Sequence, residues 1–283
     1  MREFYSNFPS IALLTLPRFG IAVAAAAAIF LLEYLIRPRP AMFRNRKWLH
    51  DILYYAFYNS ILAVAILAVP ERRLFLPLLK LLNWRILATL PALPGFVIFF
   101  VTADFVSYWH HRWMHSRFLW AFHSVHHEQR ELTAFTSGRK HLVEAATTPI
   151  LLLALTAVLG SQPQDALWFF VLRFLKDGTL HSGLRWSYGP FYWIVVSPLF
   201  HSAHHSTEME VSNSNFGVFF SFWDMIFGTH RYTSFAPERQ GVDGLSMPTL
   251  WSQFWLPFKM AKQSMETTAS TSPELESATV SRE

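Results

Sequence analysis

The chain contains no cysteine, and this absence limits its chemistry before any motif is considered. Without cysteine there can be no disulfide, no cysteine-ligated zinc or iron–sulfur cluster, and no thiol nucleophile. Any metal that the protein holds must therefore be bound by nitrogen and oxygen ligands.

Charged residues are also scarce, at 15% of the 283 residues, whereas hydrophobic residues make up 52%. The chain has 27 Phe and 11 Trp, which is too apolar and aromatic for an ordinary soluble domain and indicates a membrane protein. A net charge of +5 could suit nucleic-acid binding, but the Lys and Arg residues cluster between apolar runs instead of lining one face. We therefore expect loops beside a bilayer and no nucleic-acid partner.

Five apolar segments are candidates to span or enter the bilayer: residues 19–36, 49–69, 91–109, 145–160 and 164–180. A Gly-Ser-Gln-Pro turn joins the last two, which are predicted to form a helical hairpin. The link at 37–47 is rich in Arg, and the positive-inside rule places it in the cytoplasm. The predicted fold class is an all-α integral membrane protein with about four to five transmembrane helices and a cytosolic, histidine-rich helical cap.

Histidine is arranged in three strings: HRWMH at 111–115, HSVHH at 123–127 and HSAHH at 201–205. With 13 His in 283 residues, an HxxHH pattern is expected only about 0.03 times by chance. Residues three and four apart share one face of a helix, so each string would direct its imidazoles to one side. The predicted metal ligands are the eight histidines of the strings, with His181 as a ninth candidate: His111, His115, His123, His126, His127, His181, His201, His204 and His205.

These imidazoles are too many for one metal, which takes about four to six ligands, and suit two. Counting crossings from the cytoplasmic link brings all three strings and His181 to one side of the membrane, so a single dinuclear site is predicted. Four other histidines are expected to be interfacial or structural: His50, His110, His141 and His230. Four acids could either hold the ligands or act as caps: Asp104, Glu144, Asp177 and Asp224.

Ligand type alone does not choose among iron, zinc, copper and nickel. A structural zinc needs only four ligands, and hydrolytic zinc normally has a nearby carboxylate, as in the HExxH motif that this chain lacks. Two irons with open positions can activate dioxygen, and a site beside a bilayer meets unactivated C–H bonds. The pattern therefore favours lipid oxidation.

The strings, in this order, resemble the histidine boxes of the membrane-bound fatty acid hydroxylase and sterol desaturase superfamily. The first box corresponds to DFVSYWHHRWMH at 104–115, the second to HSVHH and the third to PLFHSAHH at 198–205. His181 occupies the place of the family's isolated histidine. Downstream of the third box, three short motifs resemble the family's NFG, WD and FGT signature: Asn215-Phe216-Gly217, Trp223-Asp224 and Phe227-Gly228-Thr229.

The resemblance implies that the nine histidines bind two iron ions under a cytosolic cap. Some members have a further ligand four residues before the isolated histidine, where this chain has Asp177. The chain has no HPGG haem motif and no cysteine for an iron–sulfur cluster. An external donor, cytochrome b5-like or ferredoxin-like, would then supply electrons for O2 and a lipid substrate.

The predicted function is hydroxylation or desaturation of an unactivated C–H position of a lipid. One alternative is a sterol or carotenoid desaturase or hydroxylase. Another is a histidine-rich metal transporter or sensor, although transport sites lie near the bilayer midplane and these strings follow the apolar runs. A haem protein with two axial histidines would leave most of the strings unexplained.

Three regions are predicted: an N-terminal transmembrane anchor at 1–90, a fatty acid hydroxylase-like catalytic domain at 91–235 and a C-terminal cytosolic segment at 236–283. The polar composition after about residue 260 predicts disorder. We expect a multi-pass membrane protein whose histidine site faces the cytoplasm. The short chain, without an appended domain or an evident retrieval signal, favours a bacterial inner membrane over the endoplasmic reticulum.

Overall fold

The computed structural model describes residues 20–21, 23–38, 43, 47–57, 86–161 and 163–280. Over these residues the chain is helical, and extended segments pair only in two isolated bridges, Val195 with Phe220 and Ser206 with Gln240. The all-α fold class is therefore confirmed for the described part of the chain.

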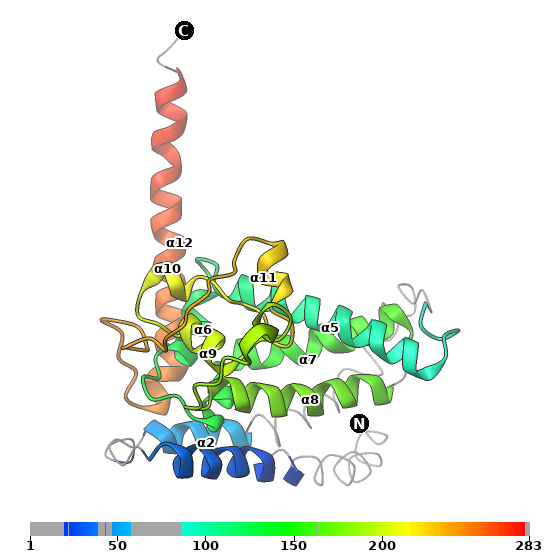
Figure 1. The fold of residues 1–283 in the computed structure, drawn as a ribbon. Helices are drawn as coiled ribbons and strands as arrows, with labels where there is room; N and C mark the ends of the chain where they lie inside the picture. Colours follow the sequence, from blue (N-terminus) through cyan, green and yellow to red (C-terminus); the bar gives the residue numbers. More distant parts are fainter. Residues whose placement is uncertain are drawn as a thin grey trace, which may run out of the picture.

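Three long helices form the body of the molecule: α5 (Ala92–Met114), α7 (Leu142–Leu159) and α8 (Pro163–His181) (Figure 1). They meet in a buried core to which α5 contributes Phe99, α7 contributes Leu152 and α8 contributes Phe169. The predicted hairpin is present, because α7 ends at Gly160 in the left-handed conformation (φ 65°) and α8 begins three residues later. The three helices thus pack side by side around one apolar core.

Two of these helices, α5 and α7, are long and apolar enough to cross a bilayer. They match the predicted spans at 91–109 and 145–160. The predicted span at 164–180 is helical, but α8 carries several charges and is not among the candidate spans. Val23–Ile36 forms a shorter apolar helix, and residues 58–69 of the second predicted span lie outside the described residues. The count of four to five spans and the cytosolic orientation stay predictions.

Helix α2 (Lys47–Phe57) lies next to the 3₁₀ turn η3 (Ala134–Gly138), which connects α6 with α7. Tyr55 of α2 packs with Phe135 of η3 and with Ala26 in a second buried cluster. The backbones approach so closely that a Cβ on Gly138 would lie 2.6 Å from the Cα of Tyr55. Glycine is therefore required at this contact, which fixes α2 against the segment leading into α7.

Short helices gather where α5 and α8 end and α7 begins: α6 (Trp120–His127), α9 (Pro198–His204), α10 (Met209–Ser212) and α11 (Phe222–Ile226) (Figure 1). A second 3₁₀ turn, η4 (Gly189–Trp193), precedes α9. Ser197 caps α9, because its hydroxyl accepts a hydrogen bond from the backbone N–H of Phe200 at 3.1 Å, and Pro198 fits the first turn of the helix. All three histidine strings therefore lie at the same end of the bundle.

Helix α12 (Leu250–Val280) packs against α6, where the rings of Phe258 and Phe122 are 5.4 Å apart. Its C-terminal part projects away from the rest of the molecule (Figure 1). The helix passes through the residues after about 260, where composition predicts a disordered tail. That tail and the division of the chain into three regions stay predictions.

Candidate metal centre

Four helices deliver the nine predicted ligands to one place. Helix α5 presents two imidazoles one turn apart as it ends, and α6 presents three on the face turned toward them. Helix α8 contributes its final residue, and α9 contributes two residues and the one that follows it. In chain order these are His111 and His115, then His123, His126 and His127, then His181, and last His201, His204 and His205.

The nine imidazoles form two groups, in each of which one ligand atom per residue lies within 4.8 Å of the others. No other such group of His, Asp and Glu occurs in the described part of the chain. The two groups adjoin, since the rings of His127 and His205 stack with centroids 4.4 Å apart. Cluster one contains His111, His115, His123, His127 and His204, and cluster two contains His126, His181, His201 and His205.

Backbone carbonyls fix the ring orientation in cluster two. The Nδ1 of His126 donates to the carbonyl of Arg139 at 3.1 Å, and the Nδ1 of His181 donates to the carbonyl of Asp177 at 2.7 Å. A carbonyl can only accept, so the proton of each neutral ring is on Nδ1 and the Nε2 carries a lone pair. The two Nε2 atoms nevertheless face each other at 2.9 Å, where neither can donate a hydrogen bond to the other.

This arrangement of lone pairs fits a shared cation. Two nitrogens bound at about 2.1 Å and at right angles around one metal are about 3.0 Å apart. In cluster two the Nε2 of His181 lies 2.9 Å from that of His126 and 3.0 Å from that of His201. The donor set is therefore compatible with one metal ion in this cluster.

Cluster one is built in the same way. The Nδ1 of His111 donates to the carbonyl of Phe216 at 2.9 Å, and that of His204 donates to the carbonyl of Ser214 at 2.7 Å. The Nδ1 of His123 lies 2.8 Å from a carboxylate oxygen of Glu144. These partners leave the opposite nitrogens for a metal, and the Nε2 atoms of His204 and His115 are buried without a hydrogen-bond partner.

The imidazole rings of His127, His204 and His205 are neutral, which is the form that binds metals. Burial, reinforced by repulsion between neighbouring imidazoles, lowers the pKa of His127 and His205 well below the usual value. Burial also lowers the pKa of His204 to about 3. A neutral imidazole is the form that ligates a metal, so these rings need not lose a proton before binding at neutral pH.

Of the four candidate acids, only Glu144 contacts a predicted ligand through its side chain. Asp177 reaches His181 through its backbone carbonyl, while its carboxylate accepts from Nε of Arg173 at 3.3 Å. Asp104 accepts the backbone N–H groups of Phe219 and Phe220 at 3.0 and 3.1 Å. Asp104 therefore shapes a loop of the cap without touching a histidine ring.

Asp224 is fully buried and binds the loop that carries Phe216. Its carboxylate accepts the backbone N–H of Phe216 at 2.7 Å, that of Gly217 at 2.8 Å and the hydroxyl of Thr229 at 2.7 Å. Burial raises the pKa of Asp224 to about 6, against the opposing effect of these donors. The acid thus acts on His111 indirectly, by fixing the carbonyl of Phe216.

The four histidines set aside by the sequence analysis lie outside both clusters. His110 pairs with the hydroxyl of Thr147 at 2.8 Å, and His50 pairs with the side chain of Gln253 at 3.2 Å. His141 caps α7 by accepting from the N–H of Val143, and His230 stacks on Trp193. The sequence analysis missed the carbonyls that hold the rings, because a backbone atom leaves no residue-type signal.

Comparison with known proteins places this architecture in a family. The sequence pattern of the family described as fatty acid hydroxylase matches residues 96–229, which include every predicted ligand. A very-long-chain aldehyde decarbonylase of Oryza sativa subsp. japonica is 30% identical over 254 residues, covering 85% of this chain and 86% of that protein. The chain belongs to the fatty acid hydroxylase and sterol desaturase superfamily.

Other members of the superfamily align with about half of this chain. A methylsterol monooxygenase of Arabidopsis thaliana is 33% identical over 48% of this chain and 52% of its own length. An ornithine lipid hydroxylase of Rhizobium tropici is 29% identical over 47% of this chain and 40% of its own length. No solved structure matches the chain. Superfamily membership confirms the resemblance seen in the histidine strings and identifies the chain as a membrane-associated oxidoreductase.

Proposed function

We propose that this chain is a membrane-bound di-iron oxygenase that hydroxylates or desaturates an unactivated C–H position of a lipid. It would use O2 and electrons from an external donor, cytochrome b5-like or ferredoxin-like. One observation carries the proposal: nine histidines meet in two adjoining clusters, and in five of them Nδ1 is held by a backbone carbonyl or by Glu144, which leaves Nε2 for a metal.

Cluster one would hold one iron and cluster two the other. Bound there, the two irons would supply the activation of dioxygen and the oxidising power that an unactivated C–H bond requires. The protein supplies the remaining conditions. The carbonyl of Arg139 keeps the proton of His126 on Nδ1, and that of Ser214 does the same for His204. As neutral ligands, the imidazoles add no negative charge to the centre.

Seven of the nine rings are buried, and burial protects a strong oxidant from side reactions with water. His204 and His205 are 0% exposed. The ring of Phe216 lies 5.0 Å from that of His115 and 5.6 Å from that of His204, so it closes one side of cluster one with apolar surface. We also propose that residues 91–235 form the catalytic domain and that the site faces the cytoplasm.

The class of substrate is argued from the relatives. Their names refer to a very-long-chain aldehyde, a methylsterol and an ornithine lipid, and we propose a lipid substrate for this chain on that basis. A sterol is the alternative within the same chemistry. Conversion of a long-chain aldehyde is a second candidate, because the decarbonylase aligns with 85% of this chain and the methylsterol enzyme with 48%.

A metal transporter is disfavoured by the position of the clusters. The ligands lie at the end of α5 and beyond it, whereas transport sites occupy interrupted helices near the bilayer midplane. The carbonyl partners fix the orientation of the rings, which favours a permanently bound metal over a transported ion.

A lipid comparison tests the proposed reaction. We expect cells that express the wild-type chain to contain lipids heavier by one oxygen or lighter by two hydrogens than those of cells expressing the His126→Ala variant. High-resolution mass spectrometry of total lipid extracts, with a matched electron donor supplied, would show the difference. Products shortened by one carbon from added aldehydes would favour the second candidate. Identical lipid profiles with no aldehyde turnover would contradict both.

A further inference from the structure

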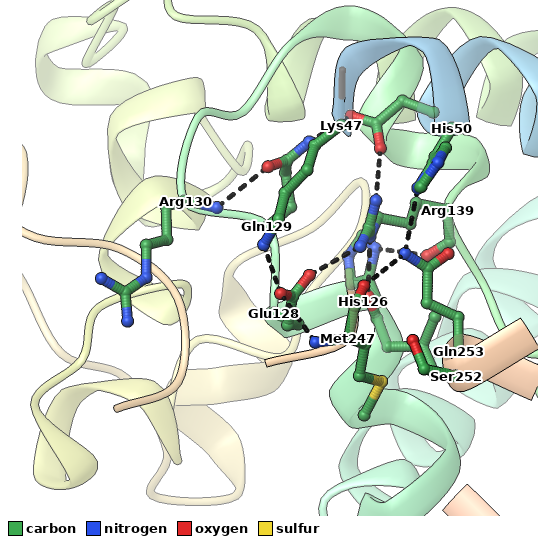
Figure 2. A network of polar contacts seen from close by, with 12 residues as sticks. Lys47, His50, His126, Glu128, Gln129, Arg130, Arg139, Met247, Ser252 and Gln253 are labelled. Carbon is green, nitrogen blue, oxygen red and sulfur yellow. Dashed lines mark hydrogen bonds and ion pairs between the residues drawn. The ribbon is translucent and has the colours of Figure 1, made fainter. Parts of the chain in front are cut away.

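A buried ion network joins three segments of the chain beside cluster two. At its centre the guanidinium of Arg139 is completely buried and uses three of its nitrogens. It donates to the carboxylate of Asp51 on α2 at 3.1 Å, to that of Glu128 at 2.6 Å and to the carbonyl of Val125 at 2.9 Å. Figure 2 shows Arg139 in the middle of this network, with His126 beside it.

The same residue holds His126 through its backbone, because the carbonyl of Arg139 accepts the Nδ1 proton of that ring. Two partners of the Arg139 side chain flank these histidines: Val125 immediately precedes His126, and Glu128 immediately follows His127. The side chain of Arg139 therefore binds α6 on both sides of its last two histidines. Its carbonyl holds Nδ1 of His126, so that Nε2 of this ring faces His181. All of its contacts with α6 lie within two residues of His126.

The counter-charges come from outside the histidine strings. Asp51 of α2 also accepts the hydroxyl of Thr136 at 2.7 Å and the amide of Gln129 at 2.9 Å, so its carboxylate is saturated with donors. Glu128 accepts in addition from the ammonium of Lys47 and from the backbone N–H of Met247. Two cations and two anions balance within the network, which lets the guanidinium remain charged in a buried position.

We propose that Arg139, clamped by Asp51 and Glu128, is a positioning residue for cluster two, and that α2 is thereby a part of the metal centre. This inference rests on the proposed two-metal function. Three of the five rings of cluster one use other supports: His123 uses Glu144, and His111 and His204 use the carbonyls of Phe216 and Ser214. Loosening the network should therefore affect one metal and leave the other bound.

The test is the iron content of the anaerobically purified full-length chain, measured by elemental analysis for the wild type and for Asp51→Asn. Asparagine removes the negative charge of residue 51. It also places an N–H₂ group, which cannot accept a hydrogen bond, next to donors that now bind the carboxylate of Asp51. We expect the variant to retain about one iron per chain, with the affinity of the lost site lower by about 10–100-fold. Far-UV circular dichroism should be unchanged.

Three matched variants sharpen the result. Glu144→Ala removes the acceptor of His123 in cluster one and should cost the other iron, so combining it with Asp51→Asn should leave about none. Asp243→Asn makes the same change at an exposed carboxylate that pairs with Arg239 at 2.9 Å, and should keep both irons. Glu128→Gln replaces Asp51→Asn if the latter does not fold.

The outcomes separate the inference from the proposed function. Two irons in Asp51→Asn would overturn the positioning role. Loss of both irons from a folded variant, or misfolding of both Asp51→Asn and Glu128→Gln, would show that the network is purely structural and would overturn it as well. A wild-type chain that does not bind two metals would overturn the proposed metal centre, and the inference with it.

Discussion

Turnover should fall below detection when His126 is replaced with Ala, while the protein remains folded. His126 is 2% exposed, and its Nε2 lies 2.9 Å from that of His181, so the substitution removes a nitrogen from the interior of cluster two. Loss of a partner that only supports a metal ligand typically costs about 10–100-fold in affinity or activity. Removal of the ligand itself should cost more than that.

The fold should tolerate this change because His126 belongs to none of the hydrophobic clusters in the described part of the chain. Alanine also favours the helical conformation, so α6 should be retained. His204→Ala should have the same effect on turnover through cluster one. The matched control is His230→Ala, because His230 stacks on Trp193 and belongs to neither cluster. Full activity in His126→Ala would contradict the assigned site, provided that the iron content is measured in parallel.

Asp224→Ala should produce the largest loss of stability among the variants considered, together with loss of the iron in cluster one. The substitution leaves the N–H groups of Phe216 and Gly217 and the hydroxyl of Thr229 without their acceptor. Each buried donor left unsatisfied costs about 1–3 kcal/mol, so we expect a total of about 3 kcal/mol or more. The loop also carries the carbonyl that holds His111, which should then reorient.

Thermal unfolding in detergent, followed by circular dichroism, would measure the loss as a lower Tm. The control is Asp243→Ala, where the carboxylate is 53% exposed and its ion pairs are worth about 0–1 kcal/mol. We expect that variant to unfold at a Tm close to that of the wild type. An Asp224→Ala protein with an unchanged Tm and two irons would show that the loop around Phe216 does not depend on this acid.

The grouping of the nine histidines could be predicted from the sequence because its signal is local. Each string repeats histidine at positions three and four apart, and this spacing survives into α5, α6 and α9 as a shared face. His181 was predicted from its place between the hairpin and the third string. What joins the strings is the folding of α5, α7 and α8. Apolar runs predicted all three helices as candidate spans, and two of them are long and apolar enough to cross a bilayer.

Glu144 was named as a candidate and does contact His123. The other supports of the rings could not be predicted, since they depend on tertiary contacts between distant residues. Phe216 holds His111 through a carbonyl 105 positions away, and Asp51 reaches Arg139 across 88 positions. Asp104 and Asp224 were named as candidates for contact with the ligands, yet their carboxylates bind backbone N–H groups. A carboxylate near a histidine string in sequence can serve either purpose, and only the fold distinguishes them.

The most direct test of the account is the metal content of the wild-type protein. Elemental analysis of the full chain, purified without oxygen from cells supplied with iron, should give about two irons per chain. Five and four histidines in two adjoining clusters offer ligands for that number. A single tightly held zinc per chain, with no iron, would contradict the proposed oxygenase.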